Sequence, residues 1–93
     1  DPFLALYMYY QLQQEFGWEA FKNVFARYHK LSRSQRPKND QEKRDQWMFF
    51  FSKVAKQNLG PFFQLWGIPI SESSQESVSN LPIWLPIGFP PKE

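Results

Sequence analysis

The stretch QQEFGWEAF, residues 13–21, places a single glycine between two long helical patterns. Upstream of it, residues 3–16 contain neither Gly nor Pro, and their apolar side chains recur at helical spacing and nearly encircle the first turns. Gly17 is a natural helix stop. Because only this residue is available to redirect the chain, the pattern predicts a tight corner between two helices. The first helix, apolar on nearly all sides, is expected to be central and buried.

The second helix carries an apolar stripe formed by Trp18, Phe21, Phe25 and Tyr28. Their spacing of i, i+3, i+7 and i+10 places them along one side of a helix, which predicts a face buried against a neighbour. We therefore expect Trp18 to lie in the core, and Trp66 as well. Truncation of either tryptophan to alanine is expected to cost about 3–5 kcal/mol.

Three further helices follow from capping and stop signals. Asn39 stands three residues before Glu42, and Ser73 stands three residues before Glu76, which is the spacing of a capping box. Pro61 is suited to the first turn of a short helix between these two. The predicted helices span about 3–16, 18–31, 40–57, 61–66 and 73–79.

The fold class predicted from these elements is all-α, with four to five helices in an irregular bundle over residues 1–80. Residues 81–93 are expected to form an extended, proline-rich tail. Trp84 and Leu85 in this tail are large apolar side chains, so we expect it to fold back on the domain. The consecutive Phe49 to Phe51 cannot all face one way on a helix. At least one of them points away from the core face, either under the tail or into an interface with another domain.

Composition excludes several classes of protein. The 93 residues include 11 Lys and Arg against 9 Asp and Glu, a net charge of +2, and 42% hydrophobic residues, which is typical of one small globular domain or a piece of a larger one. There is no Cys for a disulfide or a thiolate zinc site. No apolar run approaches the roughly 18–20 residues of a membrane span, and no signal peptide is recognisable. The first residue is Asp1 rather than Met, which is expected of an excised piece of a longer protein.

The candidate catalytic residues all have simpler structural interpretations. His29 is the only histidine and lies on the polar flank of the second helix. A typical zinc centre uses two or three histidine ligands, so a single histidine cannot supply them. Glu15 and Glu19 are four residues apart, but Gly17 interrupts the helix between them. A further acidic group stands at a helix start, where the helix dipole favours negative charge. This group consists of Asp40, Glu42 and Asp45. No catalytic, cofactor-binding or metal-binding residue is predicted.

The segment 27–44 is basic, because it contains seven cations and two carboxylates. The carboxylates are Asp40 and Glu42. Such a segment suits the phosphates of nucleic acid or lipid, or an acidic protein surface. It contains no nucleic-acid recognition motif and no interleaved aromatic residues, so a solvated loop and helix start is favoured and nucleic-acid binding is not expected. The cations are Arg27, Lys30, Arg33, Arg36, Lys38, Lys43 and Arg44.

Two parts of the chain resemble the closing helical part of the enhancin-like, peptidase M60-like domain. The first comprises YQLQ at 10–13, FGWEAF at 16–21, Tyr28 and LS at 31–32. The second comprises NLGPFFQLWGIPI at 58–70 and LPIW at 81–84. The resemblance covers about residues 3–86. It is closest to the vertebrate TRP-channel-associated factors, including the prostatitis-antigen-like paralogues.

The resemblance implies a zinc peptidase fold whose catalytic residues lie upstream of Asp1. The family's zinc site uses an H-E-x-x-H helix and a downstream Glu, and no position of this chain matches them. The resemblance implies structural roles for several residues of this chain. It also implies that the first helix packs against the upstream catalytic half. The scaffold residues are Gly17, Trp18 and Phe21 at a first corner, and Phe62, Trp66, Gly67 and Pro69 at a second.

The function expected from this resemblance is that of a non-catalytic helical scaffold and protein-interaction subdomain of a channel-trafficking factor. Its expected partners are a TRP channel and the upstream half of the domain, and its expected location is cytoplasmic, at the plasma membrane through the channel. As an isolated fragment it is expected to be a monomer without a cofactor. The alternative is a C-terminal supporting subdomain of an active zinc metallopeptidase.

Overall fold

The computed structural model describes residues 2–86, with side chains from residue 6, and confirms an all-α fold. Within residues 2–86, β-type pairing consists of an isolated bridge between Asn58 and Ile83. The predicted tail beyond residue 86 lies outside the described residues. The elements are α1 (Pro2–His29), a 3-10 helix η1 (Arg33–Gln35), α2 (Asp40–Ala55), α3 (Gly60–Leu65) and α4 (Glu72–Ser77).

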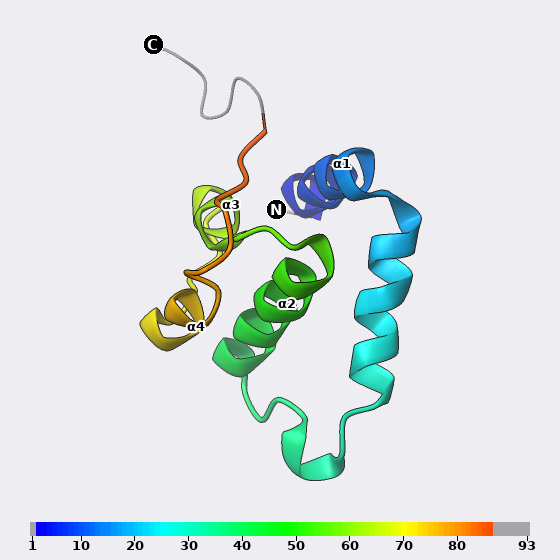
Figure 1. Cartoon of the computed structure of the whole chain (residues 1–93), viewed down its shortest axis with the longest axis vertical. Coiled ribbons are helices and arrows are strands. Elements are labelled where there is room, and N and C mark those ends of the chain that lie inside the picture. Colours follow the sequence, from blue (N-terminus) through cyan, green and yellow to red (C-terminus); the bar gives the residue numbers. More distant parts are fainter. Residues whose placement is uncertain (1, 87–93) are drawn as a thin grey trace.

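A sharp corner at Gly17 divides α1 into an N-terminal arm (residues 2–16) and a C-terminal arm (residues 18–29). Gly17 has φ 79° and ψ 169°, a backbone region that is essentially restricted to glycine. Figure 1 shows the two arms running in different directions, with the C-terminal arm descending beside α2. The corner expected from the sequence is therefore confirmed.

The α2 helix lies between the C-terminal arm of α1 on one side and α3 and α4 on the other (Figure 1). Its start is capped by Asn39, whose side chain accepts a hydrogen bond of 2.8 Å from the Glu42 N–H. The Glu42 carboxylate accepts from the Lys38 N–H, one residue before the position that a capping box uses. The helix ends at Lys56, which adopts the left-handed conformation with φ 57°.

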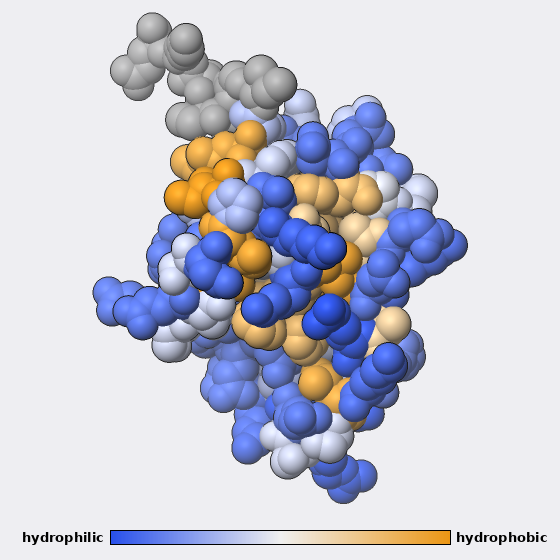
Figure 2. All heavy atoms as spheres, in the orientation of Figure 1, coloured by the Kyte–Doolittle hydropathy of each residue, from blue (hydrophilic) through white to orange (hydrophobic). Residues whose placement is uncertain are grey.

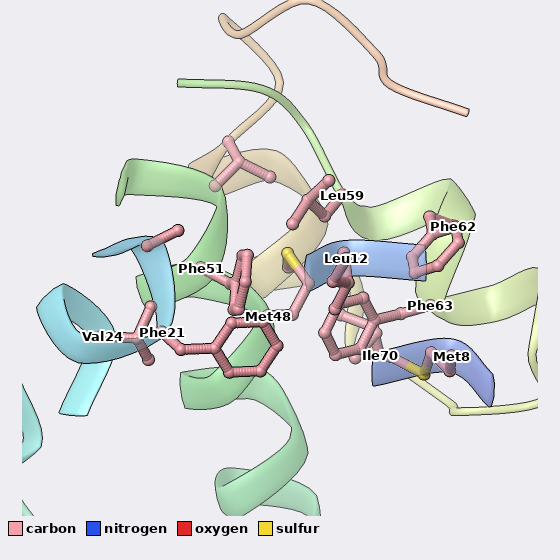
Figure 3. Packing of buried hydrophobic residues seen from close by; sticks show 12 residues of the cluster. Met8, Leu12, Phe21, Val24, Met48, Phe51, Leu59, Phe62, Phe63 and Ile70 are labelled. Carbon is pink, nitrogen blue, oxygen red and sulfur yellow. The ribbon is translucent and has the colours of Figure 1, made fainter. Parts of the chain in front are cut away.

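The core lies where α1, α2 and α3 meet, with Phe51 of α2 near its centre. The Phe51 ring contacts the rings of Phe16, Phe21 and Trp47 at centroid distances of 6.1, 5.1 and 5.8 Å, all edge to face. Figure 3 shows Phe21 and Phe51 side by side, with Leu12 of the N-terminal arm nearby. The buried apolar side chains are Met8, Leu12, Ala20, Phe21, Val24, Met48, Phe51, Leu59, Phe62, Phe63, Ile70 and Val78.

The stripe predicted on the C-terminal arm is wrong at two of its positions. Phe21 is buried and Tyr28 packs on Phe50 at 4.9 Å, but Trp18 is 64% exposed and Phe25 is 52% exposed. The reason is that α2 is the helix that covers this arm, and a single helix buries only a narrow row of side chains. The expectation that Trp18 lies in the core is therefore incorrect.

The start of α4 also differs from the prediction. Its N-cap is Ser71 rather than Ser73, because the Ser71 side chain accepts from the Ser74 N–H at 3.3 Å. The same Ser71 is held in place by Asp45 of α2, a contact that local spacing does not reveal. The helix consequently spans Glu72–Ser77 instead of 73–79.

The segment that follows α4 folds back on the helices, as expected for Trp84. The Asn58 N–H donates to the Pro82 carbonyl at 2.7 Å, and the Trp84 N–H donates to the Asn58 carbonyl at 3.1 Å. The Trp84 ring lies 5.1 Å from Phe16 and 5.0 Å from Phe62. Figure 2 shows hydrophobic atoms gathered over α3 and this segment, while hydrophilic residues cover most of the visible face.

The three consecutive phenylalanines point in different directions, as predicted. Phe51 enters the core and Phe50 packs on Tyr28. Phe49 is partly buried, and it lines an open hollow together with Ser73, Ser74 and Ser77 of α4.

We predict that Gly17→Ala destabilises the chain by about 1–3 kcal/mol, because a Cβ is strained at this φ and ψ. The strain is in the backbone, since an added Cβ meets no atom within 4 Å. Urea unfolding followed by circular dichroism measures the loss. Gln14→Ala, at an exposed helical position of the same arm, is the control and should change stability by less than about 0.5 kcal/mol. Equal stabilities of the two variants would show that the corner does not depend on glycine.

We predict that Phe51→Ala costs about 3–5 kcal/mol, whereas Trp18→Ala costs less than about 1 kcal/mol. The first variant leaves a cavity in the core, and the second removes a side chain that is mostly in solvent. Thermal and urea unfolding of both variants measure the difference. A loss at Trp18 as large as that at Phe51 would contradict the observed orientation of the C-terminal arm.

Candidate interaction surfaces

The described residues bring no cluster of three or more His, Asp and Glu side chains together as a possible metal site. His29 is exposed at the last turn of α1. Glu15 and Glu19 are also exposed, and Glu19 forms an ion pair with Lys22 at 3.5 Å.

Asp45 accepts three hydrogen bonds and joins α2 to the start of α4. One carboxylate oxygen accepts from the Ser71 N–H at 3.0 Å and from Gln41 Nε2 at 2.9 Å. The other accepts from the Ser71 hydroxyl at 2.8 Å. Arg44 Nε and Gln41 Nε2 both donate to the Pro69 carbonyl, at 3.2 and 3.1 Å. These bonds fasten the segment before α4 to α2, so this cluster is structural.

The same bonds determine the acidity of Asp45. Partial burial by itself raises the pKa of the Asp45 carboxyl. The hydrogen bonds from Ser71 and Gln41, together with the charge of Arg44, outweigh this effect and hold the pKa below its usual value. The folded state therefore favours the ionised carboxylate.

The N-terminal arm of α1 presents an exposed surface, which we call the α1 aromatic face and define as Leu6, Tyr7 and Tyr10. These side chains are 64%, 57% and 59% exposed. The expectation that the first helix is buried on all sides is therefore wrong for this chain, because α2 and α3 cover only the side that carries Met8 and Leu12.

The α1 aromatic face lies beside Trp66 at the end of α3 and beside the segment that follows α4. The Tyr7 ring lies 5.7 Å from Trp66 and 6.4 Å from Tyr10. Trp66 Nε1 donates to Gln11 Oε1 at 3.1 Å, which ties α3 to this arm. Beside them lies an open hollow of about 370 Å³. Its lining consists of Tyr7, Tyr10, Gln11, Gln14, Glu15, Trp84 and Pro86.

A second exposed aromatic area lies around Trp47, where the two arms of α1 meet α2. Tyr9 and Phe25 contact the Trp47 ring at 6.1 and 5.8 Å, and both remain partly in solvent. Tyr28 stacks on the same ring at 6.0 Å. Burial, followed by the influence of Tyr9, raises the pKa of Tyr28 to about 12, so this phenol stays protonated at neutral pH.

The cations predicted as one basic segment separate in space. Lys43 pairs with Asp40 at 3.8 Å, and Arg44 is engaged with Pro69. The cations of the loop around η1 are exposed; they are Arg33, Arg36 and Lys38.

Arg27 and Lys30 instead line a hollow of about 490 Å³, together with Lys53 and Lys56 of α2. Sequence reasoning missed this group, because Lys53 and Lys56 lie more than 20 residues from Arg27 and Lys30 in the sequence.

Comparison with known proteins identifies the family. Residues 1–67 match the family described as peptidase M60, enhancin and enhancin-like. This match covers more than half of the chain, and the chain belongs to the peptidase M60, enhancin and enhancin-like family.

Relatives that match the chain include proteins named TRPM8 channel-associated factors. The chain is 43% identical over 81 residues to a TRPM8 channel-associated factor homolog of Danio rerio, which covers 87% of this chain and 9% of the relative. It is 44% identical over 80 residues to TRPM8 channel-associated factor 2 of Homo sapiens, covering 86% of this chain and 8% of the relative. The chain thus spans less than a tenth of the length of these relatives. No solved structure matches it.

The residues to which the family resemblance assigns structural roles differ in how deeply they are buried. Gly17 makes the first corner, and Phe21 and Phe62 are buried, whereas Trp18 is exposed. Gly67 has φ 80° and ends the turn after α3, which accounts for a glycine at the second corner. Within residues 2–86, no helix is both long and apolar enough to cross a bilayer.

We predict that Asp45→Asn lowers stability at neutral pH and that the difference from the unmodified chain shrinks in acid. Because the folded state lowers the pKa of Asp45, its contribution is present above the pKa of the unfolded chain and is lost as the pH falls through the folded pKa. Free energies of unfolding measured from pH 7 down to about pH 3 test this. Asp40→Asn, at an exposed ion pair, is the matched control and should change stability little. A difference that stays constant with pH would count against the ionised carboxylate as its source.

Proposed function

We propose that this chain is a non-catalytic helical scaffold and interaction subdomain of a TRP-channel-associated factor. In this proposal, the α1 aromatic face packs against another part of the same peptidase M60-like domain in the intact protein. The observation that carries the proposal is the exposure of Leu6, Tyr7 and Tyr10 on the N-terminal arm. The named relatives, which are more than ten times longer than the matched segment, support it.

The chemistry of this face suits protein contact. Leucine and tyrosine side chains bury large apolar areas, and exposed groups of this kind mark docking surfaces. The tyrosine hydroxyls retain hydrogen-bonding capacity at the edge of an interface. The contacts of Tyr7 with Trp66 and of Trp66 with Gln11 hold the face against α3, so little ordering is needed before it binds.

The channel association belongs to the same proposal. The relatives are named as channel-associated factors of TRPM8, and we extend this association to the protein that contains this chain. The protein would then act in the cytoplasm and reach the plasma membrane through its channel partner. No residue of the chain is assigned to the channel contact.

An alternative function is support of an active zinc peptidase from behind its catalytic cleft. The peptidase family match favours it. An intact H-E-x-x-H motif elsewhere in the longer protein, with cleavage of casein or mucin that a chelator abolishes, would establish this alternative. The isolated chain should show no such cleavage in either case.

We predict that Tyr7→Ser with Tyr10→Ser lowers the stability of a domain that contains this chain more than that of the chain alone, which loses the contacts of Tyr7 with Trp66 and Tyr10. The experiment replaces the 81 matched residues of the Danio rerio relative with those of this chain. Each buried tyrosine at such an interface is worth about 1–2 kcal/mol, so the thermal midpoint of the chimera should fall and its proteolysis should accelerate. The unmodified chimera should co-precipitate TRPM8 as well as the relative does.

The matched control is Lys22→Ser with Glu76→Ser, at two exposed polar positions of α1 and α4 that lie outside the α1 aromatic face and its bordering hollow. It should leave both the chimera and the isolated chain unchanged. Equal destabilisation of chimera and isolated chain by the tyrosine variant would locate the effect inside this chain and refute domain packing. Failure of the stable chimera to recover TRPM8 would refute the channel association and leave the packing result standing.

A further inference from the structure

A cationic hollow lies between the C-terminal arm of α1 and the end of α2, and we call it the cationic groove. Its volume is about 490 Å³, within the usual range of sites for small ligands. Four of its seven lining residues are cations, and none is a carboxylate. The lining consists of Asn23, Ala26, Arg27, Lys30, Lys53, Val54 and Lys56.

The charges of the cationic groove are not neutralised by the protein. Among the described residues, the ion pairs are Lys22 with Glu19 and Lys43 with Asp40, and neither includes a groove cation. The Lys53 ammonium has a partial partner in the Phe49 ring, 5.4 Å from its centroid. The ends of α1 and α2 each contribute about half a negative charge, which is less than the four cations supply. A concave surface lined by one sign of charge concentrates the field and attracts counter-ions.

We infer that the cationic groove binds a small anion carrying several phosphate monoesters, of the inositol polyphosphate type. Arg27 offers a planar fork of N–H donors that fits phosphate oxygens, and the lysines offer mobile point charges. Asn23 adds an uncharged amide donor at the same wall. Such an anion occurs both free in solution and as the headgroup of a phosphoinositide lipid, and the groove chemistry is the same for both.

The lining argues against other anionic partners. A peptide needs pockets for side chains, but the apolar lining is limited to Ala26 and Val54. A single-stranded nucleic acid needs aromatic platforms for its bases, and no aromatic residue lines the groove. The compact volume and the convergence of four cations favour a small ligand of high charge density.

This site is separate from the α1 aromatic face, because it uses residues 23–30 and 53–56 instead of residues 6–10. It therefore goes beyond the proposed scaffold function and can be tested without a protein partner.

The test is calorimetric titration of the 93-residue chain with inositol hexakisphosphate, comparing two variants of equal charge. Lys30→Gln with Lys53→Gln removes two groove cations and should weaken binding at least tenfold, since each cation near a phosphate contributes about fivefold. Arg33→Gln with Lys38→Gln removes two cations from the exposed loop around η1 and should change affinity less than about twofold. All four positions are at or near the surface, and circular dichroism confirms that each variant folds.

A third variant tests the groove without removing a cation. Ala26→Glu places a carboxylate in its wall at an exposed helical position, where the fold tolerates the change. Binding should fall as strongly as in the lysine variant, because the new charge repels phosphate and pairs with its neighbours.

Vesicles distinguish the two sources of the anion. Phosphatidylcholine vesicles with about 5 mol% phosphatidylinositol bisphosphate serve as the lipid probe, with phosphatidylcholine alone as blank. Groove-dependent binding to vesicles identifies a lipid headgroup, and groove-dependent binding to the soluble polyphosphate alone identifies a free ligand. Either result supports the inference.

Three results would overturn it. The first is no binding of either probe at low salt. The second is an equal loss of affinity for inositol hexakisphosphate in the groove and loop variants, which would show that binding responds to net charge alone. The third is binding of polyglutamate or single-stranded RNA as tight as that of inositol hexakisphosphate, which would assign the groove to a peptide or nucleic-acid partner.

Discussion

The backbone conformation of Gly17 is the constraint on which the arrangement of helices depends. With φ 79° and ψ 169°, this residue lets one helical segment change direction without a connecting loop. The C-terminal arm can then lie along α2 through Phe21 and Val24, while the N-terminal arm reaches α3 through Met8 and Leu12. A straight α1 of 28 residues would extend about 40 Å and could not contact both partners within so small a domain.

Aromatic edge-to-face packing around Phe51 fills the space that this corner creates. Rings from both arms of α1 and from α2 meet there, and Trp84 closes the far side against Phe16 and Phe62. A domain of this size has more apolar side-chain surface than its few helices can cover. The remainder appears at Leu6, Tyr7 and Tyr10 and at Trp18 and Phe25. The apolar surface offered to a partner is thus a direct consequence of building a small domain from large side chains.

Sequence reasoning succeeded where the signal was local. The corner at Gly17, the cap at Asn39 and the different directions of the three phenylalanines all follow from backbone preferences and helical periodicity over a few residues. It failed at Trp18 and Phe25, because periodicity identifies an apolar side but not how many helices cover it. It also failed at the start of α4, where a contact with Asp45, 26 residues away in sequence, selects Ser71 over Ser73 as the cap.

The amino-acid sequence by itself therefore determined that the helices exist, where α1 bends and to which family the chain belongs, because these features depend on local composition and on ordered motifs. It did not determine which faces remain exposed or which charges meet. Arg27 and Lys30 looked continuous with the loop cations that follow them, yet they share a groove with Lys53 and Lys56. That grouping exists only because the C-terminal arm of α1 packs beside α2, and the energy of such packing comes from residues distant in sequence.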